Sequence, residues 1–349
     1  MPEFDLTQHA HRRKNLLTGE WILVSPNRTQ RPWQGAITPP AERRLPAYDP
    51  ACYLCPGNTR ANGEKNPPYE STFVFTNDFS ALREETPKGR SRAHPLLSAE
   101  SERGICRVVN FSPRHDVTLA ELSVEEIERV VAVWKEEYAR LGAHPFIRHV
   151  QIFENKGALM GNSNPHPHCQ IWAQEHIPME PKKELRQFER YYHTRRRSLL
   201  ADYLKTELAL GERIIYENEA FAAVVPFWAV WPFETMIIAK RKVGSLAGFR
   251  GSEDRNFADA IRVIAAKYDN LFETSFPYSS GIHQAPTDGK PHAEWHFHMH
   301  FYPPLLRSAS IKKFMVGYEM MAEPQRDITA EHSAAVLRAL PSVHYTQRK

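Results

Sequence analysis

Two stretches of this chain, roughly 130 residues apart, carry the same features in the same order. Each has short runs rich in β-branched and aromatic residues, then an amphipathic segment long enough for a helix, then a His-x-His run. The matching positions are Ser123 with Ser252, and His168 with His298. Repetition at a fixed offset is the signature of a duplicated structural unit. We therefore expect the chain to fold as two related units.

The boundaries of several elements can be read from local signals. Ser123 and Glu126 form a capping-box pattern at the start of the first helix, and Gly142 is a suitable C-cap. Between them, apolar residues recur at helical spacing. The second helix is predicted over 252–272, and helical character over 184–210 predicts a segment that joins the units. Strands are predicted over 72–75, 107–111, 221–225 and 235–239.

These elements predict the α+β class, with two units that each hold an antiparallel sheet and helices. A length of 349 residues fits two domains, since one domain takes about 100–200 residues. We place them at residues 1–190 and 191–349.

Composition and charge exclude several kinds of partner. No apolar run approaches the roughly 20 residues that span a bilayer, and no secretory signal is recognisable at the N-terminus, so a cytoplasmic location is expected. The net charge is only +4, and the dense basic runs at 195–197 and 240–242 are short. Nucleic-acid binding requires a more extended basic surface, so we expect neither nucleic acid nor membrane as a partner.

Cys52 and Cys55 stand in a Cys-x-x-Cys-Pro-Gly pattern. Two thiolates at this spacing can bind one Zn²⁺ with tetrahedral geometry. The other two cysteines are not a second such pair, so histidine would have to complete the site. The alternatives are a redox pair, which would need a thioredoxin-like helix start that is absent here, and a disulfide, which is unusual in a cytosolic protein.

His166 and His168 follow a run of small and polar residues, Gly157 to Asn164. On a strand, His166, His168 and Gln170 would point to the same face. Small residues leave backbone N–H groups accessible to an oxyanion such as phosphate, and a neutral imidazole is a competent nucleophile at phosphorus. The alternative is that both histidines make ordinary structural hydrogen bonds.

The second repeat has alternating histidines at 296, 298 and 300, with Asp288, Glu294 and His283 before them. Imidazoles near carboxylates favour a metal site with nitrogen and oxygen ligands, since carboxylates would repel phosphate. A solvent-exposed histidine strand is the alternative. The pattern alone does not decide which repeat holds a nucleophile.

Seven segments resemble the galactose-1-phosphate uridylyltransferase family, in its order and over about residues 5–345. They are CYLCPGN (52–58), KNPPY (65–69), FTNDF (75–79), NFSPRH (110–115), SNPHPHCQ (163–170), HFYPPLLR (300–307) and KFMVGYE (313–319). The resemblance implies two histidine-triad-like units. It also implies an enzyme of galactose metabolism, in the Leloir pathway, that exchanges UMP between UDP-glucose and galactose 1-phosphate by a ping-pong route through a uridylyl-histidine.

The resemblance also implies roles for single residues. His168 would be the nucleophile, and Gln170 would bind the phosphoryl oxygens. A zinc site would take Cys52, Cys55, His115 and His166. A second metal, usually assigned to iron, would take Glu184, His283, His298 and His300. Other substrate contacts would come from Arg28, Arg31, Asn77, Asp78, Asn155, Ser163, Lys313, Phe314, Tyr318, Glu319 and Gln325. A homodimer with active sites shared between subunits is implied as well.

Two other functions remain as alternatives. One is a related phosphorylase or hydrolase that passes the nucleotidyl group to phosphate or water; Gln170 argues against it, because hydrolytic triads carry histidine there. The other is a nucleotide- or metal-sensing protein without turnover, which would bind a UDP-sugar but form no covalent adduct.

Overall fold

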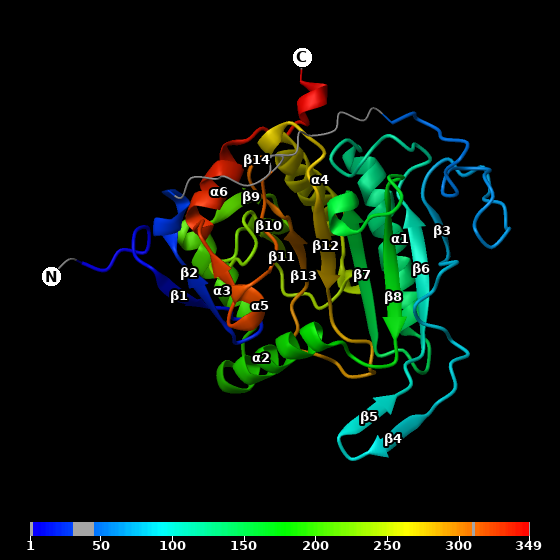
Figure 1. Ribbon diagram of the computed structural model, residues 1–349, viewed down its shortest axis with the longest axis horizontal. Helices are drawn as coiled ribbons and strands as arrows, with labels where there is room; N and C mark the ends of the chain where they lie inside the picture. The colour runs from blue at the N-terminus through cyan, green and yellow to red at the C-terminus, as the bar shows by residue number, and fades with distance from the viewer. Residues whose placement is uncertain (1–2, 31–44, 309–310, 349) are drawn as a thin grey trace.

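The computed structural model describes residues 3–30, 45–308 and 311–348 (Figure 1). Within these ranges the centre of the protein is one antiparallel sheet of nine strands, in the order β3-β6-β8-β7-β12-β13-β11-β10-β9. The strands are β3 (Phe73–Thr76), β6 (Gly104–Asn110), β7 (His149–Lys156), β8 (His168–Gln174), β9 (Ile214–Glu217), β10 (Phe221–Val224), β11 (Thr235–Ala239), β12 (Tyr278–His283) and β13 (His298–Tyr302).

The predicted duplication is visible in the order of these strands. The first unit reads β3-β6-β8-β7 and the second reads β10-β11-β13-β12, so corresponding strands occupy corresponding places. The units meet where β7 pairs antiparallel with β12, with Phe153 opposite Gly281. The α+β class and the two units are thus confirmed. The sequence did not indicate that the two sheets join edge to edge into one.

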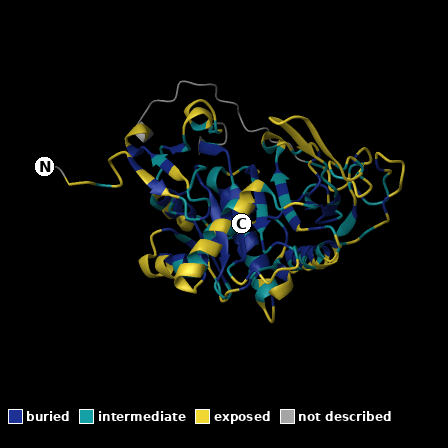
Figure 2. Cartoon of the chain, turned by 90° about the horizontal axis from the view of Figure 1, so that it is seen from below, coloured by how far each residue is buried: buried dark blue, intermediate teal, exposed yellow. Residues whose placement is uncertain are grey.

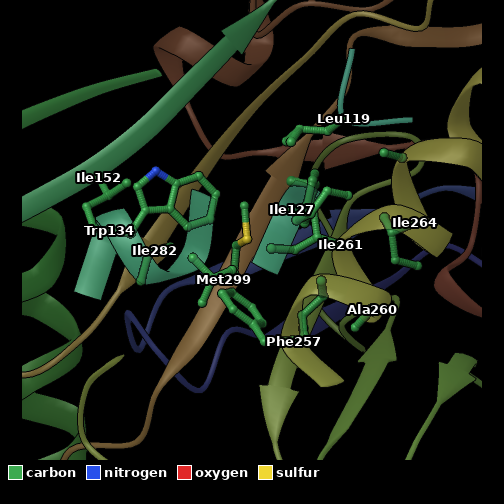
Figure 3. Packing of buried hydrophobic residues seen from close by; sticks show 14 of the residues in the cluster. Leu119, Ile127, Trp134, Ile152, Phe257, Ala260, Ile261, Ile264, Ile282 and Met299 are labelled. Carbon is green, nitrogen blue, oxygen red and sulfur yellow. The ribbon is translucent and has the colours of Figure 1, made fainter. Parts of the chain in front are cut away.

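Two long helices, α1 (Val124–Gly142) and α4 (Glu253–Phe272), cover one face of the sheet and pack against each other. Figure 3 shows Ile127 and Trp134 of α1, and Ile261 and Ile264 of α4, directed into the same core as Ile282 and Met299 of the sheet. Burying so much apolar surface is the main driving force for this layer. The predicted capping box between Ser123 and Glu126 is present.

Gly142 does not cap α1 as predicted, because it is the last helical residue and Ala143 is the C-cap. A glycine is needed at position 142 for a different physical reason. A Cβ atom at position 142 would lie 2.6 Å from Cγ2 of Thr287, a contact too close to be tolerated. Gly142 therefore permits close packing against a distant loop and does not supply a left-handed turn.

The opposite face of the second unit is covered by α2 (Met179–Arg195) and α3 (Leu199–Leu210), which take the place of the single joining segment predicted over 184–210. A small sheet of β1 (His11–Lys14), β2 (Trp21–Val24) and β16 (Gln325–Arg326) adds to this layer. The alternation of side chains supports the division, since Ala222 and Val224 face this second core while Phe221 and Ala223 face the first. Buried residues accordingly concentrate in the central strands (Figure 2).

The remaining elements lie at the periphery. They are the hairpin β4 (Arg90–His94) and β5 (Leu97–Glu100), the pair β14 (Leu305–Ser308) and β15 (Ile311–Lys312), the helices α5 (Tyr318–Met321) and α6 (Ala330–Ala339), and the 3-10 turns η1 (Pro26–Gln30), η2 (Ala158–Met160), η3 (Leu246–Gly248) and η4 (Tyr345–Gln347). Among the described residues, no helix combines the length and apolar character needed to cross a bilayer.

Candidate active site and metal centres

Strand β8 directs alternate side chains to opposite faces of the sheet. Cys169, Ile171 and Ala173 are buried against the helical layer. His168 and Gln170 therefore point to the other face, as a strand requires. His168 begins the strand directly after the loop that leaves β7.

The ring of His168 is oriented by the backbone. Its Nδ1 lies 2.7 Å from the carbonyl oxygen of His166, and because a carbonyl oxygen can only accept, Nδ1 must carry the proton. This tautomer leaves the lone pair on Nε2. Burial also lowers the pKa of His168 below that of an exposed histidine, which favours the neutral ring. The backbone contact and the lowered pKa both favour a neutral ring with a free lone pair on Nε2, which a nitrogen nucleophile requires.

A small pocket of about 40 Å³ adjoins His168. Its lining includes Asn155, Ser163 and Gln170, so four predicted site residues, His168 included, come together there. Gly161, in the left-handed region at φ 82°, turns the loop that forms one wall. Ser279 donates from its hydroxyl to Oδ1 of Asn155 at 2.7 Å, which ties the opposite wall to β12 of the second unit.

Two donors hold the side-chain oxygen of Gln170. The indole Nε1 of Trp172 lies 3.0 Å from Gln170 Oε1, and Nδ2 of Asn77 lies 3.4 Å from the same oxygen. With its oxygen engaged in this way, Gln170 has its amide N–H groups left to donate elsewhere. Sequence reasoning missed Trp172, because an aromatic residue on a strand is usually interpreted as packing.

The predicted binding residues Asn77 and Asp78 line a neighbouring pocket of about 520 Å³. Arg60 is a further lining residue that the sequence did not single out. Its guanidinium stacks over Phe75 at 4.4 Å, and its Nε lies 3.8 Å from Oδ1 of Asp78. A lone arginine in a loop carries no pattern signal, so only the fold reveals its position.

The first candidate metal centre brings together Cys52, Cys55, His115 and His166, all of them buried. Their ligand atoms lie within 4.8 Å of one another. His166 donates from Nε2 to the carbonyl oxygen of Ser112 at 2.9 Å, which leaves Nδ1 to face the thiol of Cys55 at 3.6 Å. Two sulfur and two imidazole donors fit a tetrahedral ion. The four cysteines are all free, so the disulfide alternative is not supported.

This first centre is connected to the candidate nucleophile. The carbonyl group of His166 accepts the Nδ1 proton of His168, while the imidazole of His166 faces the thiol of Cys55 in the candidate metal centre. Fixing His166 therefore fixes the acceptor that orients His168. Such outer contacts commonly set the tautomer and direction of a working histidine.

The second candidate centre brings together Glu184 of α2, His283 of β12, and His298 and His300 of β13. The Glu184 carboxylate lies 2.9 Å from His283 Nδ1, 3.4 Å from His298 Nε2 and 3.6 Å from His300 Nε2. Glu184 Oε2, His298 Nε2 and both ring nitrogens of His300 are buried without a hydrogen-bond partner. Burying polar atoms without a partner is costly. A cation bound among these nitrogen and oxygen atoms would supply the missing partner.

The two repeats keep the same backbone contacts but differ at the reactive nitrogen. His298 donates from Nδ1 to the carbonyl of His296 at 2.8 Å, just as His168 donates to the carbonyl of His166. However, Nε2 of His298 faces the carboxylate of Glu184, whereas His168 adjoins an amide-lined pocket. This difference favours the first repeat as the site of a nucleophile, a choice that the sequence pattern left open.

The other predicted substrate contacts lie elsewhere in the chain. Arg28 pairs with Asp327 at 3.2 Å, Gln325 donates to the same carboxylate at 2.6 Å, and Lys313 pairs with Glu319. Phe314 and Tyr318 are exposed. Arg31 lies outside the described residues. None of the described residues in this group lines the small pocket beside His168.

Comparison with known proteins agrees with this arrangement. Models for the N-terminal and C-terminal domains of galactose-1-phosphate uridyl transferase match residues 2–178 and 184–349. The galactose-1-phosphate uridylyltransferase of Haemophilus influenzae is 51% identical over 345 residues, which cover 99% of this chain and 98% of that protein. The Rattus norvegicus enzyme is 49% identical, with coverage of 98% and 90%.

Solved structures show the same fold. A uridylyltransferase with 26% identity superimposes with a TM-score of 0.76, over 97% of this chain and 99% of that one. An ADP-glucose phosphorylase from Arabidopsis thaliana, 21% identical, gives 0.74 over 95% and 99% of the two chains, which is a likeness of fold alone. From the full-length matches in sequence, this chain belongs to the galactose-1-phosphate uridylyltransferase family of transferases.

Proposed function

We propose that the protein exchanges a uridylyl group between UDP-glucose and galactose 1-phosphate, through a covalent intermediate on His168. The observation that carries the proposal is the tautomer of His168, whose Nδ1 proton is held by the carbonyl of His166 at 2.7 Å. This tautomer leaves the lone pair on Nε2, and His168 lines a small pocket together with Asn155 and Gln170. The relatives named above are called galactose-1-phosphate uridylyltransferases, and this chain matches them over nearly their whole length.

The first half-reaction follows from this geometry. Nε2 of His168 attacks the phosphorus of the uridylyl group, and the bond from that phosphorus to the oxygen of glucose 1-phosphate breaks. The departing oxygen takes the electron pair, so glucose 1-phosphate leaves without needing a proton. The amide of Gln170 donates to the non-bridging oxygens, where negative charge must be stabilised during the transfer.

The second half-reaction is the same chemistry reversed with a new acceptor. A phosphate oxygen of galactose 1-phosphate attacks the uridylyl phosphorus, and the nitrogen–phosphorus bond returns its electron pair to Nε2. UDP-galactose leaves, and His168 is again neutral. The carbonyl of His166 accepts from Nδ1 throughout, so it stabilises the positive ring of the intermediate.

Purified protein given UDP-glucose and three acceptors in parallel would test this function. We expect rapid release of glucose 1-phosphate with galactose 1-phosphate as acceptor, and much slower release with inorganic phosphate or water. Preferential transfer to phosphate or water would contradict the proposal in favour of a phosphorylase or hydrolase. Binding of UDP-glucose without any release would favour a sensing protein.

We also propose that the first centre holds Zn²⁺ and the second holds iron. Cys52, Cys55, His115 and His166 supply the two thiolates and two imidazoles of a closed structural zinc site. Glu184 with three histidines supplies the nitrogen and oxygen ligands suited to iron. When bound, each ion would supply strong bonds that hold its strand and loop in place. Substrate contacts would come from the chain's own residues.

The two centres should lose their metals independently. We expect Cys52→Ser to weaken zinc binding at least about a hundredfold without changing the content of the second metal. Glu184→Gln should do the converse, because its carboxylate lies against His283, His298 and His300 of the second group. Elemental analysis of the purified variants checks this. Loss of both metals from either single variant would contradict two separate centres.

We propose further that the protein is a homodimer with shared active sites. Support comes from the pocket beside His168, whose lining within one chain includes neither Lys313 nor Glu319. If the family's substrate contacts apply here, the segment carrying Lys313 must reach the His168 pocket of a second copy. The charge of Lys313 suits the phosphate groups of the substrate.

Mixing two inactive variants tests the shared site. In a heterodimer of His168→Gly and Lys313→Ala chains, one site would have both substitutions and the other would have neither. Equal mixing gives heterodimers in about half of the molecules, so we expect about a quarter of the wild-type activity, measured as UDP-galactose formed. Either variant assayed alone should form no UDP-galactose. If heterodimers are shown to form and the mixture is still inactive, His168 and Lys313 of the same chain belong to one site.

A further inference from the structure

The amide of Gln170 is held by a chain of donors that fixes which end of it faces the pocket. We propose that Trp172 is a positioning residue, which directs the amide N–H groups of Gln170 toward the transferred phosphoryl group. The proposal rests on the uridylyl transfer proposed above and adds a residue to its machinery. The indole need not contact the substrate.

The orientation of both amides follows from groups that can only donate. The backbone N–H of Phe79 donates to Oδ1 of Asn77 at 2.9 Å, so the other end of that amide, Nδ2, faces Gln170. The indole N–H of Trp172 also has no acceptor capacity. The atom of Gln170 that meets both donors must therefore be Oε1. A flipped amide would place its N–H groups against two other donors.

Trp172 is itself held firmly. It lies in β8 between β6 and β7, opposite Cys106 on one side and Gln151 on the other. Its ring makes an edge contact with Phe153 of β7, with ring centroids 5.7 Å apart. Phe153 in turn lines the pocket beside His168. The indole donor thus belongs to the rigid sheet, as a precise site requires.

Without the indole, one donor would remain on Gln170 Oε1, and it is the longer contact of 3.4 Å from Asn77. The amide would then rotate more freely, and a fraction of molecules would turn Oε1 toward the phosphoryl oxygens. Two oxygen acceptors repel each other, so those molecules would lose transition-state stabilisation. The effect should fall on kcat more than on KM, because charge at the phosphoryl oxygens shifts during the transfer.

Trp172→Phe removes the donor and keeps an aromatic ring against Phe153. We expect kcat for exchange to fall about tenfold, the effect of losing one oriented hydrogen bond, with KM for UDP-glucose changed by less than about twofold. The matched control is Trp134→Phe, which removes an indole donor to the thiol of Cys169 at 3.1 Å on the opposite face of the same strand. Its kcat should stay near that of the wild type.

The decisive measurement repeats Trp172→Phe in a Gln170→Ala background. If the indole acts through Gln170, the second substitution should lower kcat by less than about twofold there, because coupled residues are not additive. An unchanged kcat in the single variant, or a full tenfold loss in both backgrounds, would overturn the proposal. Melting temperatures confirm that each variant is folded. Wild-type protein without exchange activity would instead contradict the proposed function, and this proposal with it.

Discussion

Asparagine in place of His168 is expected to lower the exchange of glucose and galactose between UDP-sugar and hexose 1-phosphate by more than about a thousandfold. The amide of asparagine can still donate to the carbonyl of His166, so the loop need not change. It has no lone pair on nitrogen that can attack phosphorus. The measurement is the rate of UDP-galactose formation at saturating substrates.

The matched control for this prediction is His176→Asn. His176 is exposed and pairs with Glu102, in the loop that follows the same strand. We expect it to keep nearly full activity. Loss of activity in both variants would mean that the effect is not specific to the proposed nucleophile. Full activity in His168→Asn would refute the role of His168 directly.

Gln170→Glu is the second substitution with a large expected effect. The new side chain has nearly the same shape, and one of its oxygens can still accept from Trp172 and Asn77. It loses the amide donors, however, and places negative charge beside the phosphoryl oxygens. Removing one donor from such a site commonly costs about 10²–10³ in kcat, and we expect at least that loss.

The assay should separate binding from chemistry. Direct titration with UDP-glucose gives its affinity, and single-turnover release of glucose 1-phosphate gives the rate of the first half-reaction. We expect the single-turnover rate of Gln170→Glu to fall far more than its affinity for UDP-glucose does. A variant with a normal single-turnover rate would show that the Gln170 amide is not needed in the transition state.

Local signals in the sequence predicted the elements that depend on neighbouring residues. The capping box of Ser123 and Glu126 involves two positions three apart, so it can be read directly, and it is present. The repeat likewise predicted two related units. In contrast, Gly142 was misassigned because its role depends on Thr287, which is distant in sequence. Partners of this kind are set by the fold.

Some residues of the candidate site were predicted from the sequence, and others were evident only from the fold. Motif resemblance identified both groups of candidate metal ligands, and the structure brings each of them together. Arg60 and Trp172 were missed, because an isolated arginine or aromatic residue has no periodic signal. The edge pairing of β7 with β12 was also missed, because each repeat by itself predicts a full sheet with its helices and carries no signal for pairing with the other. That pairing places Ser279 of the second unit against Asn155 of the first, a residue of the proposed substrate pocket.

Intact-protein mass measurement tests whether a covalent uridylyl group forms on Nε2 of His168. Wild-type protein incubated with UDP-glucose alone should gain the mass of one uridylyl group, and acid should remove it, as expected of a phosphorus–nitrogen bond. The adduct should be absent from His168→Asn. A wild-type protein that exchanges uridylyl groups but never gains this mass, or that carries the adduct on another residue, would refute a covalent intermediate on His168.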